Sequence, residues 1–337
     1  MQMNFYIRTT LAFVIVIMAI ACQPQKEYIR TEGLIFGTIY HMTYESSEDL
    51  SDTIQSTLNA FDWSMSTYKE ESVISKINRN VSIETDTYFR QVFNKANEIT
   101  EATNGAFDMT VAPLVNAWGF GFSKKDSVTA ATIDSIMNDV GMNMVRLEGQ
   151  KIVKDRPGIM LDGSAIAKGF AVDVIADLLE SFDVEHYMVE IGGEMRVKGH
   201  NPKSTAWRVG IDKPIDDPEV LNRQLQEIIG ISDIALATSG NYRNFYVKGG
   251  KKYAHTISPF TGYPVDHPLL GVSVLAPDCM SADAYATAFM VLGFEKSLDI
   301  VENHPDLEAY FILDGSEDEE YDIKMSKGFK RYIIDKN

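Results

Sequence analysis

The chain of 337 residues contains 48 acidic and 31 basic residues, so its formal net charge is −17 at pH 7. Because no cluster of Lys and Arg offsets this balance, the composition argues against nucleic acid as a partner. An anionic ligand must therefore be bound by a local group, such as a cation, a helix N-terminus or a few hydrogen-bond donors.

The N-terminus predicts an exported chain with a lipid anchor. Arg8 precedes an apolar run over residues 11–21, which is too short to span a bilayer comfortably. Cys22 directly follows Ala-Ile-Ala, and this junction resembles a bacterial lipobox, in which the cysteine is lipidated and becomes the mature N-terminus. An uncleaved signal anchor and ordinary cleavage near Ala21 are the alternatives.

These features divide the chain into three parts. We expect a signal peptide over residues 1–21, a polar tether over 22–32 and a single domain over 33–337, exported, anchored through Cys22 to a bacterial membrane and facing the periplasm. Cys279 is then the only thiol of the domain, so burial rather than a disulfide must stabilise the fold. The hydrophobic content of 45% is sufficient for this in a chain of this length.

In the first half of the chain, helical periodicity alternates with short apolar segments. Ile54, Leu58 and Phe61 fall on one side of a helix, and Asn104-Gly105 is a helix stop signal. The predicted elements are, in order, a strand or hairpin over 33–44, helices over 51–64 and 88–103, a buried loop or short strand pair over 106–121, a helix over 133–140, and strands over 144–147, 151–153 and 158–162.

The second half opens on the clearest helix of the chain, in which apolar residues recur every four positions from Ile166 to Phe182. The other predicted elements are strands over 187–191, 195–198, 207–211, 234–238, 244–247, 253–257 and 272–275, helices around Asp283 and over 295–301, a strand pair over 309–313 and 329–334, and a solvated acidic loop over 316–322. Because strands come in hairpin-like runs between isolated helices, we expect the α+β class.

One helical pair of oxygen-bearing side chains suggests a cation site. Asp283 and Thr287 are four residues apart, so they share one helix face. A carboxylate and a hydroxyl form an incomplete oxygen site that Mg²⁺ completes with carbonyls, water or a ligand phosphate. The alternative is a helix cap and a packed hydroxyl.

Three other segments have the chemistry of a phosphate site. Lys168 lies in the first turn of a helix that follows the Gly163-Ser164 turn, where free N–H groups suit a phosphate, although a capped helix with a solvated lysine is the alternative. The Gly192-Gly193 pair marks either a bulge or a close approach by a ligand. His255 ends a predicted strand before a turn, where it is either structural or placed to deprotonate a nucleophile.

The ordered motifs together resemble a known family. The series GTIYHMTY, STYKEESVISKIN, GAFDMTVAPLVNAWGFG, DGSAIAKGFAVD, EIGGEMRVKG, ATSGNYRNFY, HTISPFTGYPV and ADAYATAFMVLG is similar to that of the ApbE-type FAD:protein FMN transferases and covers residues 33–334. The chain departs from the family pattern at Gly163, Glu190, Ser258 and Phe260.

The resemblance implies a fold and an activity. It implies one α+β domain of two lobes, with mixed or antiparallel sheets, packed helices and FAD in a cleft between them. It also implies transfer of the FMN half of FAD, with Mg²⁺, to a Thr or Ser hydroxyl of a target flavoprotein, such as a subunit of a membrane redox pump or an exported electron carrier, and release of AMP. An FAD pyrophosphatase that uses water as the acceptor, and a non-catalytic FAD-binding lipoprotein, are the alternatives.

The resemblance also assigns roles to individual residues. By this correspondence Asp283, Thr287 and the backbone carbonyl of Ala165 ligate Mg²⁺, and His255 is the catalytic residue at the pyrophosphate. The residues that line FAD are Met42, Tyr68, Ala106, Phe107, Asp108, Lys168 and Ile257.

Overall fold

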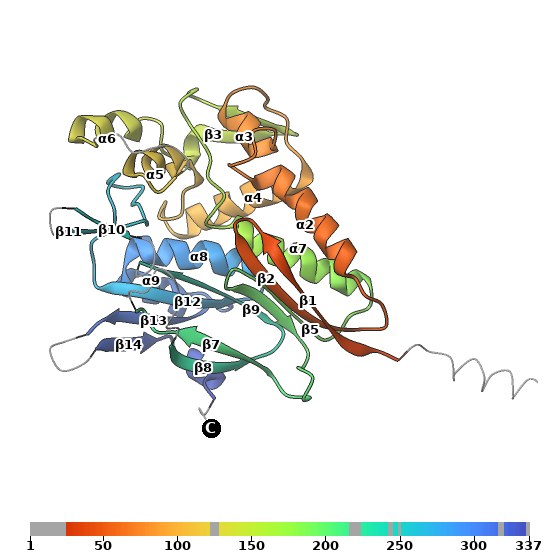
Figure 1. The fold of residues 1–337 in the computed structure, drawn as a ribbon. Helices are drawn as coiled ribbons and strands as arrows, with labels where there is room; N and C mark the ends of the chain where they lie inside the picture. Colours follow the sequence, from red (N-terminus) through yellow and green to blue (C-terminus); the bar gives the residue numbers. More distant parts are fainter. Residues whose placement is uncertain are drawn as a thin grey trace, which may run out of the picture.

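Among the residues that the structure describes, an antiparallel sheet of eight strands runs through the centre of the molecule (Figure 1). All neighbouring strands pair antiparallel, and the sheet joins strands from the beginning, the middle and the end of the chain. In spatial order the strands are β1 (Glu27–Ile35), β2 (Thr38–Ser46), β5 (Tyr187–Ile191), β6 (Glu194–Lys198), β9 (Ile234–Gly240), β12 (Leu269–Ala276), β13 (Glu308–Asp314) and β14 (Tyr321–Met325).

The computed structural model describes residues 25–121, 128–215, 224–241, 245–248, 251–315 and 320–334. The predicted signal peptide over 1–21 and Cys22 lie outside these residues. Within the described ranges, none of the helices has the length and apolar character needed to cross a membrane.

Helices form a layer on one face of the sheet (Figure 1). Helix α7 packs on β5 and β6, helix α8 packs on β9 and β12, and α2 and α4 lie over α7 and α8 respectively. The helices are α2 (Ser51–Met65), α3 (Val73–Asn78), α4 (Thr87–Ala102), α5 (Ala112–Trp118), α6 (Ala130–Met137), α7 (Ala167–Ser181), α8 (Cys279–Leu292) and α9 (Phe294–Asn303), with short 3₁₀ turns η1 (Met109–Val111), η2 (Met142–Met144) and η3 (Phe329–Tyr332).

Smaller elements complete the domain. The hairpin of β7 (Trp207–Asp212) and β8 (Leu225–Ile231) packs with η3 on the opposite face of the sheet, around a second buried cluster that includes Ile229 and Phe329. Two further hairpins are formed by β3 (Val145–Glu148) with β4 (Lys151–Lys154), and by β10 (Phe245–Lys248) with β11 (Lys251–Ala254). The α+β class with antiparallel sheets and packed helices, expected from the sequence, is confirmed.

The N-terminal strand begins earlier than the sequence predicted. Residues 27–32, predicted as part of the tether, pair in register with β2, from Glu27 opposite Ser46 to Glu32 opposite His41. Pairing of backbone groups along β2, rather than an apolar pattern, specifies this polar strand.

Two predictions in the first half of the chain are wrong. Within residues 106–121, where a loop or strand pair is predicted, residues 109–118 form η1 and α5, because Pro113 in the first turn fits a helix start. Residues 158–162 form no strand. Their N–H groups bond elsewhere: Leu161 donates to Asn78 Oδ1 at 2.7 Å, and Asp162 donates to the Met109 carbonyl at 2.7 Å.

The C-terminal strand pair also differs from the prediction. The partner of β13 is β14, whose Tyr321 and Asp322 fall in the predicted acidic loop, whereas residues 329–332 form η3. In β14 four residues, including Ile323, are partly buried, so edge pairing with β13 outweighs the polar composition. Neither β8 nor α3 is predicted from the sequence.

Helices α7 and α8 cross unusually closely. A Cβ atom added to Gly169 would lie 2.2 Å from the Cys279 carbonyl oxygen, so only glycine fits. The Gly169 N–H donates to Asp283 Oδ2 at 3.0 Å. The Asp173 carboxylate accepts from the N–H groups of Cys279 and Met280, at 2.9 and 2.8 Å. These bonds fix the start of α8 against α7.

We expect Gly169→Ala to lower the free energy of unfolding by about 1–3 kcal/mol, since the added methyl group meets backbone rather than a movable side chain. Urea unfolding followed by circular dichroism measures this loss. Gly163→Ala is the matched control, because its Cβ would meet the flexible end of Met65 and should change stability by less than about 1 kcal/mol. Equal effects of the two substitutions would contradict the close crossing.

Candidate active site

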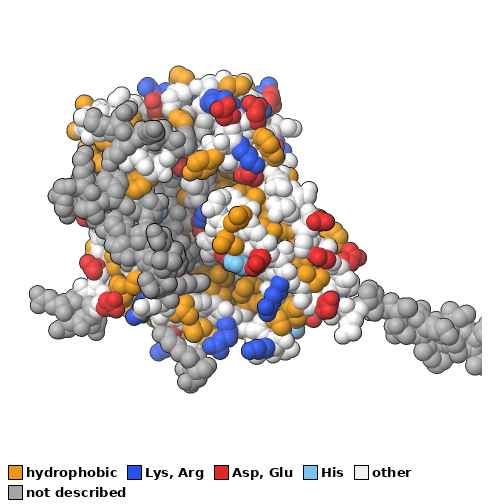
Figure 2. Space-filling model, viewed as in Figure 1, with side chains coloured by type: hydrophobic (Ala, Val, Ile, Leu, Met, Phe, Trp, Pro, Cys, Tyr) orange, Lys and Arg blue, Asp and Glu red, His pale blue; other side chains and the backbone are white. Residues whose placement is uncertain are grey.

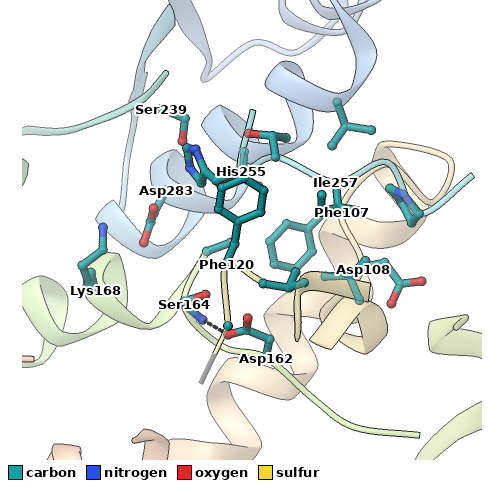
Figure 3. A pocket seen from close by; sticks show the side chains of 18 of the residues that line it. Phe107, Asp108, Phe120, Asp162, Ser164, Lys168, Ser239, His255, Ile257 and Asp283 are labelled. Atoms are coloured by element: carbon teal, nitrogen blue, oxygen red, sulfur yellow. Dashed lines mark hydrogen bonds between the residues drawn. The ribbon is translucent and has the colours of Figure 1, made fainter. Parts of the chain in front are cut away.

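A cavity of about 480 Å³ lies where the helical layer meets the ends of several strands. Among the described residues it is lined from α7, α8, the β5–β6 turn, β9, the loop after α4 and the loop after β11 (Figure 3). The lining residues are Thr67, Tyr68, Ala106, Phe107, Asp108, Val111, Val115, Phe120, Gly121, Asp162, Ser164, Ala165, Lys168, Gly192, Glu194, Thr238, Ser239, Gly240, His255, Thr256, Ile257, Pro259, Asp283, Thr287 and Val291.

One part of the cavity is charged and largely buried. Asp283 is 3% exposed, and Lys168 forms an ion pair with the buried carboxylate of Glu194. Burial raises the pKa of Asp283, an effect that Lys168 and the Gly169 N–H partly offset. Burial by itself lowers the pKa of Lys168, but the carboxylates of Glu194 and Asp283 outweigh it and raise that pKa. Lys168 is therefore a permanent cation at physiological pH.

Oxygen atoms from α8 and its neighbours could hold a hard cation. Asp283 and Thr287 line the same cavity as Ala165, and Thr287 Oγ1 lies 3.3 Å from Ser239 Oγ. No group of three or more His, Cys, Asp and Glu side chains suited to a metal occurs in the described part of the chain. A cation here would thus depend on a mixed set of carboxylate, hydroxyl and carbonyl oxygens, which is the chemistry that Mg²⁺ accepts.

The other part of the cavity is aromatic and apolar. In Figure 3, Phe107 and Ile257 lie to one side of His255, and Lys168 and Asp283 lie to the other. The rings of Phe120 and His255 are 6.3 Å apart and inclined by 68°, which is an edge-to-face contact. Tyr68 is 80% exposed, so it lies at the rim. This wall suits one face of a planar heterocycle.

The Asp108 carboxylate stabilises the backbone that forms one wall of the cavity. Its Oδ1 accepts the Thr110 N–H at 2.7 Å and caps η1, while Oδ2 accepts the Met142 N–H at 3.2 Å. Burial raises the pKa of Asp108, and these hydrogen bonds oppose that shift. The carboxylate holds η1 and η2 together behind the aromatic wall.

Met42 is the one predicted FAD-contacting residue that does not line the cavity. Its side chain is 1% exposed and belongs to the main hydrophobic core, on the inward face of β2 with Tyr40 and Tyr44. The period-two alternation of β2 directs it into the core. All ten of the other predicted site residues, Tyr68, Ala106, Phe107, Asp108, Ala165, Lys168, His255, Ile257, Asp283 and Thr287, line the cavity together.

Sequence reasoning missed Glu194. The Gly192-Gly193 pair just before it was singled out as a bulge or a close approach, and the backbone there has φ angles of 63° and 107°. That turn directs Gly192 and Glu194 to the cavity. The signal was present in the glycines, but only the fold reveals that the carboxylate meets Lys168 from another element.

Comparison with known proteins identifies the family to which the chain belongs. A model of the ApbE family matches residues 36–311, so the chain belongs to the ApbE family and the resemblance drawn from its motifs is confirmed. Two of its relatives are named FAD:protein FMN transferase. The one from Haemophilus influenzae is 36% identical over 328 residues, covering 92% of this chain and 93% of the relative. The one from Vibrio cholerae is 37% identical over 322 residues, covering 92% of each.

Solved structures agree with this placement. The flavin transferase ApbE from Vibrio cholerae superimposes with a TM-score of 0.81 at 35% identity, over 91% of this chain and 99% of that one. The apo form of the Pseudomonas stutzeri flavinyl transferase ApbE gives a TM-score of 0.81 at 28% identity, over 91% and 97%. The chain is accordingly an enzyme of the transferase class.

The carboxylate that anchors α8 makes stability depend on pH. Burial raises the pKa of Asp173 to about 7, above its ordinary value of 3.8. The unfolded chain therefore loses this proton first as pH rises, and the contribution of Asp173 to stability falls between about pH 4 and pH 7. Asp173→Asn removes this titration but also loses an acceptor for the N–H groups of α8.

We expect the free energy of unfolding of the wild type to exceed that of Asp173→Asn at pH 5. At pH 8 we expect this difference in free energy to be smaller. The free energies of unfolding in urea at the two pH values provide the measurement. Titrating groups that behave alike in the two proteins contribute equally to both free energies, so they cancel when wild type and variant are compared at the same pH. A difference that stayed constant from pH 5 to pH 8 would show that Asp173 is ionised in the folded protein throughout this range.

Proposed function

We propose that the chain transfers the FMN moiety of FAD to a Thr or Ser hydroxyl of a target flavoprotein, in a reaction that depends on Mg²⁺ and releases AMP. The observation that carries this proposal is the composition of one cavity. It combines an aromatic wall, a histidine and a cluster of oxygen donors beside Lys168. These parts suit, in turn, the flavin ring, the reacting centre and the pyrophosphate of FAD.

The residues present fit a magnesium ion. Asp283, Thr287 and the carbonyl of Ala165 are all oxygen donors lining the cavity, as a hard cation requires. When bound, Mg²⁺ would neutralise charge on the pyrophosphate and on the departing AMP. Lys168 supplies a second, permanent positive charge to the same end of the cavity.

His255 is the residue we assign as the general base. It lines the cavity between the aromatic wall and the charged cluster, and its ring is held edge-to-face against Phe120. By taking the proton of the acceptor hydroxyl, it allows the hydroxyl oxygen to bond to the FMN phosphorus. The bond from that phosphorus to the bridging oxygen breaks, and AMP leaves with this oxygen. A positioned base of this kind contributes about 10²–10⁴-fold to the rate.

The proposed location follows from the N-terminus. A lipidated Cys22 would hold the domain on a bacterial membrane, facing the periplasm. Strand β1 begins at Glu27, so only a short segment would separate the anchor from the sheet. The acceptors would accordingly be exported or membrane-bound flavoproteins, such as subunits of redox pumps and exported electron carriers.

Incubating the full-length chain, purified in detergent, with FAD, Mg²⁺ and a flavin-acceptor domain tests the proposal. Intact-mass analysis of the acceptor should show a gain of one FMN unit that disappears with EDTA. Release of free FMN and AMP without a gain in mass would instead indicate an FAD pyrophosphatase. FAD that stays bound and unchanged would indicate a binding protein without this activity.

We expect Asp283→Ala to lower the rate of transfer by more than about 100-fold, since it removes the α8 carboxylate of the proposed cation site. Circular dichroism should show a folded protein, because Ala is tolerated well within a helix. The matched control is Asp177→Ala, an aspartate on α7 whose side chain is 70% exposed. Full activity of Asp283→Ala would remove the metal assignment.

We expect His255→Ala to lower kcat by about 10²–10⁴-fold while the dissociation constant for FAD changes little. Single-turnover kinetics and fluorescence titration with FAD separate the two quantities. His41→Ala, at an exposed histidine on β2, is the control. A variant that bound FAD weakly but turned over normally would show that His255 positions the substrate and is not the base.

A further inference from the structure

Glu194 is held in the cavity by a turn whose backbone angles favour glycine. Strand β5 ends at Ile191 and β6 begins at Glu194, and the two intervening glycines have φ angles of 63° and 107°. The Gly192 N–H donates to the Ile39 carbonyl at 3.0 Å, which fixes the turn against β2. The residue is only 4% exposed, yet it lines the cavity.

One oxygen of this carboxylate is paired and the other is not. Oε1 accepts from the ammonium group of Lys168. Oε2 is buried and has no hydrogen-bond partner among the described residues. A buried carboxylate oxygen without a partner is costly, so it indicates a group that binds in the cavity.

The charges around Glu194 indicate which kind of group this is. The described lining residues carry four carboxylates, on Asp108, Asp162, Glu194 and Asp283, and the ammonium group of Lys168 as their only Lys or Arg side chain. A neutral donor would satisfy Oε2 but leave the excess negative charge. A phosphate group would increase it. A divalent cation satisfies the oxygen and balances the charge at once.

We propose that Glu194 belongs to the cation site, where its unpartnered oxygen and negative charge strengthen binding of a divalent cation beside Asp283. This inference rests on the proposed function, in which the cavity holds Mg²⁺. In this arrangement Lys168 and the cation share one carboxylate. Lys168 therefore competes with the cation for Glu194, and Glu194 does more than position Lys168.

Binding of Mn²⁺ to the full-length chain, followed by electron paramagnetic resonance of the free ion, tests the proposal without an activity assay. We expect Glu194→Gln to raise the dissociation constant about 10–100-fold, the range typical of residues that support a metal site. Glu190→Gln is the matched control on the same turn. Its carboxylate bonds to Gly193 N and faces His41 outside the cavity, so its Mn²⁺ affinity should equal that of wild type.

A second variant separates cation binding from a purely structural role. If Glu194 only positions Lys168, then Lys168→Gln and Glu194→Gln should change Mn²⁺ affinity in the same direction. If Glu194 also binds the cation, Lys168→Gln should tighten binding, because it removes a competing positive charge. Should Glu194→Gln fail to fold, Glu194→Asp, which keeps the charge but shortens the reach, is expected to weaken Mn²⁺ binding to a smaller degree.

The outcomes distinguish this inference from the proposed function. If wild type binds Mn²⁺ and Glu194→Gln binds it within twofold of wild type, the inference is overturned while the metal-dependent transferase stands. If wild type binds no Mn²⁺, with or without FAD, the cation site and this inference fail together. A loss of FAD affinity in Glu194→Gln at unchanged Mn²⁺ affinity would assign Oε2 to a hydroxyl of the substrate instead.

Discussion

The close crossing of α7 and α8 is the contact on which both the core and the site depend. Gly169 allows the helices to approach until its N–H reaches Asp283, and Asp173 holds the first N–H groups of α8. The same approach brings Lys168, on the first turn of α7, to the cavity that Asp283 lines. The same backbone contacts thus determine how α7 packs on α8 and where Lys168 and Asp283 lie in the cavity. This explains why a glycine is needed within helix α7.

The electrostatics of the cavity follow from burying several carboxylates beside one lysine. Desolvation raises the pKa of Asp283 and Glu194, and each carboxylate in turn raises the pKa of Lys168. A protein with a net charge of −17 therefore keeps a permanent cation in this cavity. The excess of carboxylates over ammonium groups makes the same place suited to a metal ion.

The turn of the β1–β2 hairpin exposes apolar side chains, although the chain as a whole is strongly acidic. Leu34 and Ile39, at the turn of the β1–β2 hairpin, are 76% and 50% exposed. Figure 2 shows hydrophobic side chains interspersed among charged ones on this face of the molecule. Ile39 bonds through its carbonyl to Gly192, which lines the cavity. The hairpin that begins the domain therefore extends to the edge of the site, and its strand β1 starts at Glu27.

The sequence by itself determined the family and the helices with strong periodicity, because motifs and period carry that information locally. Ten of the eleven residues that it predicted for the domain's site line one cavity. It did not determine the strands at 27–32 and 321–325, since edge strands are specified by the partner's backbone rather than by their own apolar pattern. Only the tertiary structure decided that Met42 belongs to the core and that Glu194 meets Lys168. Both depend on which elements pack together, and no local pattern encodes that.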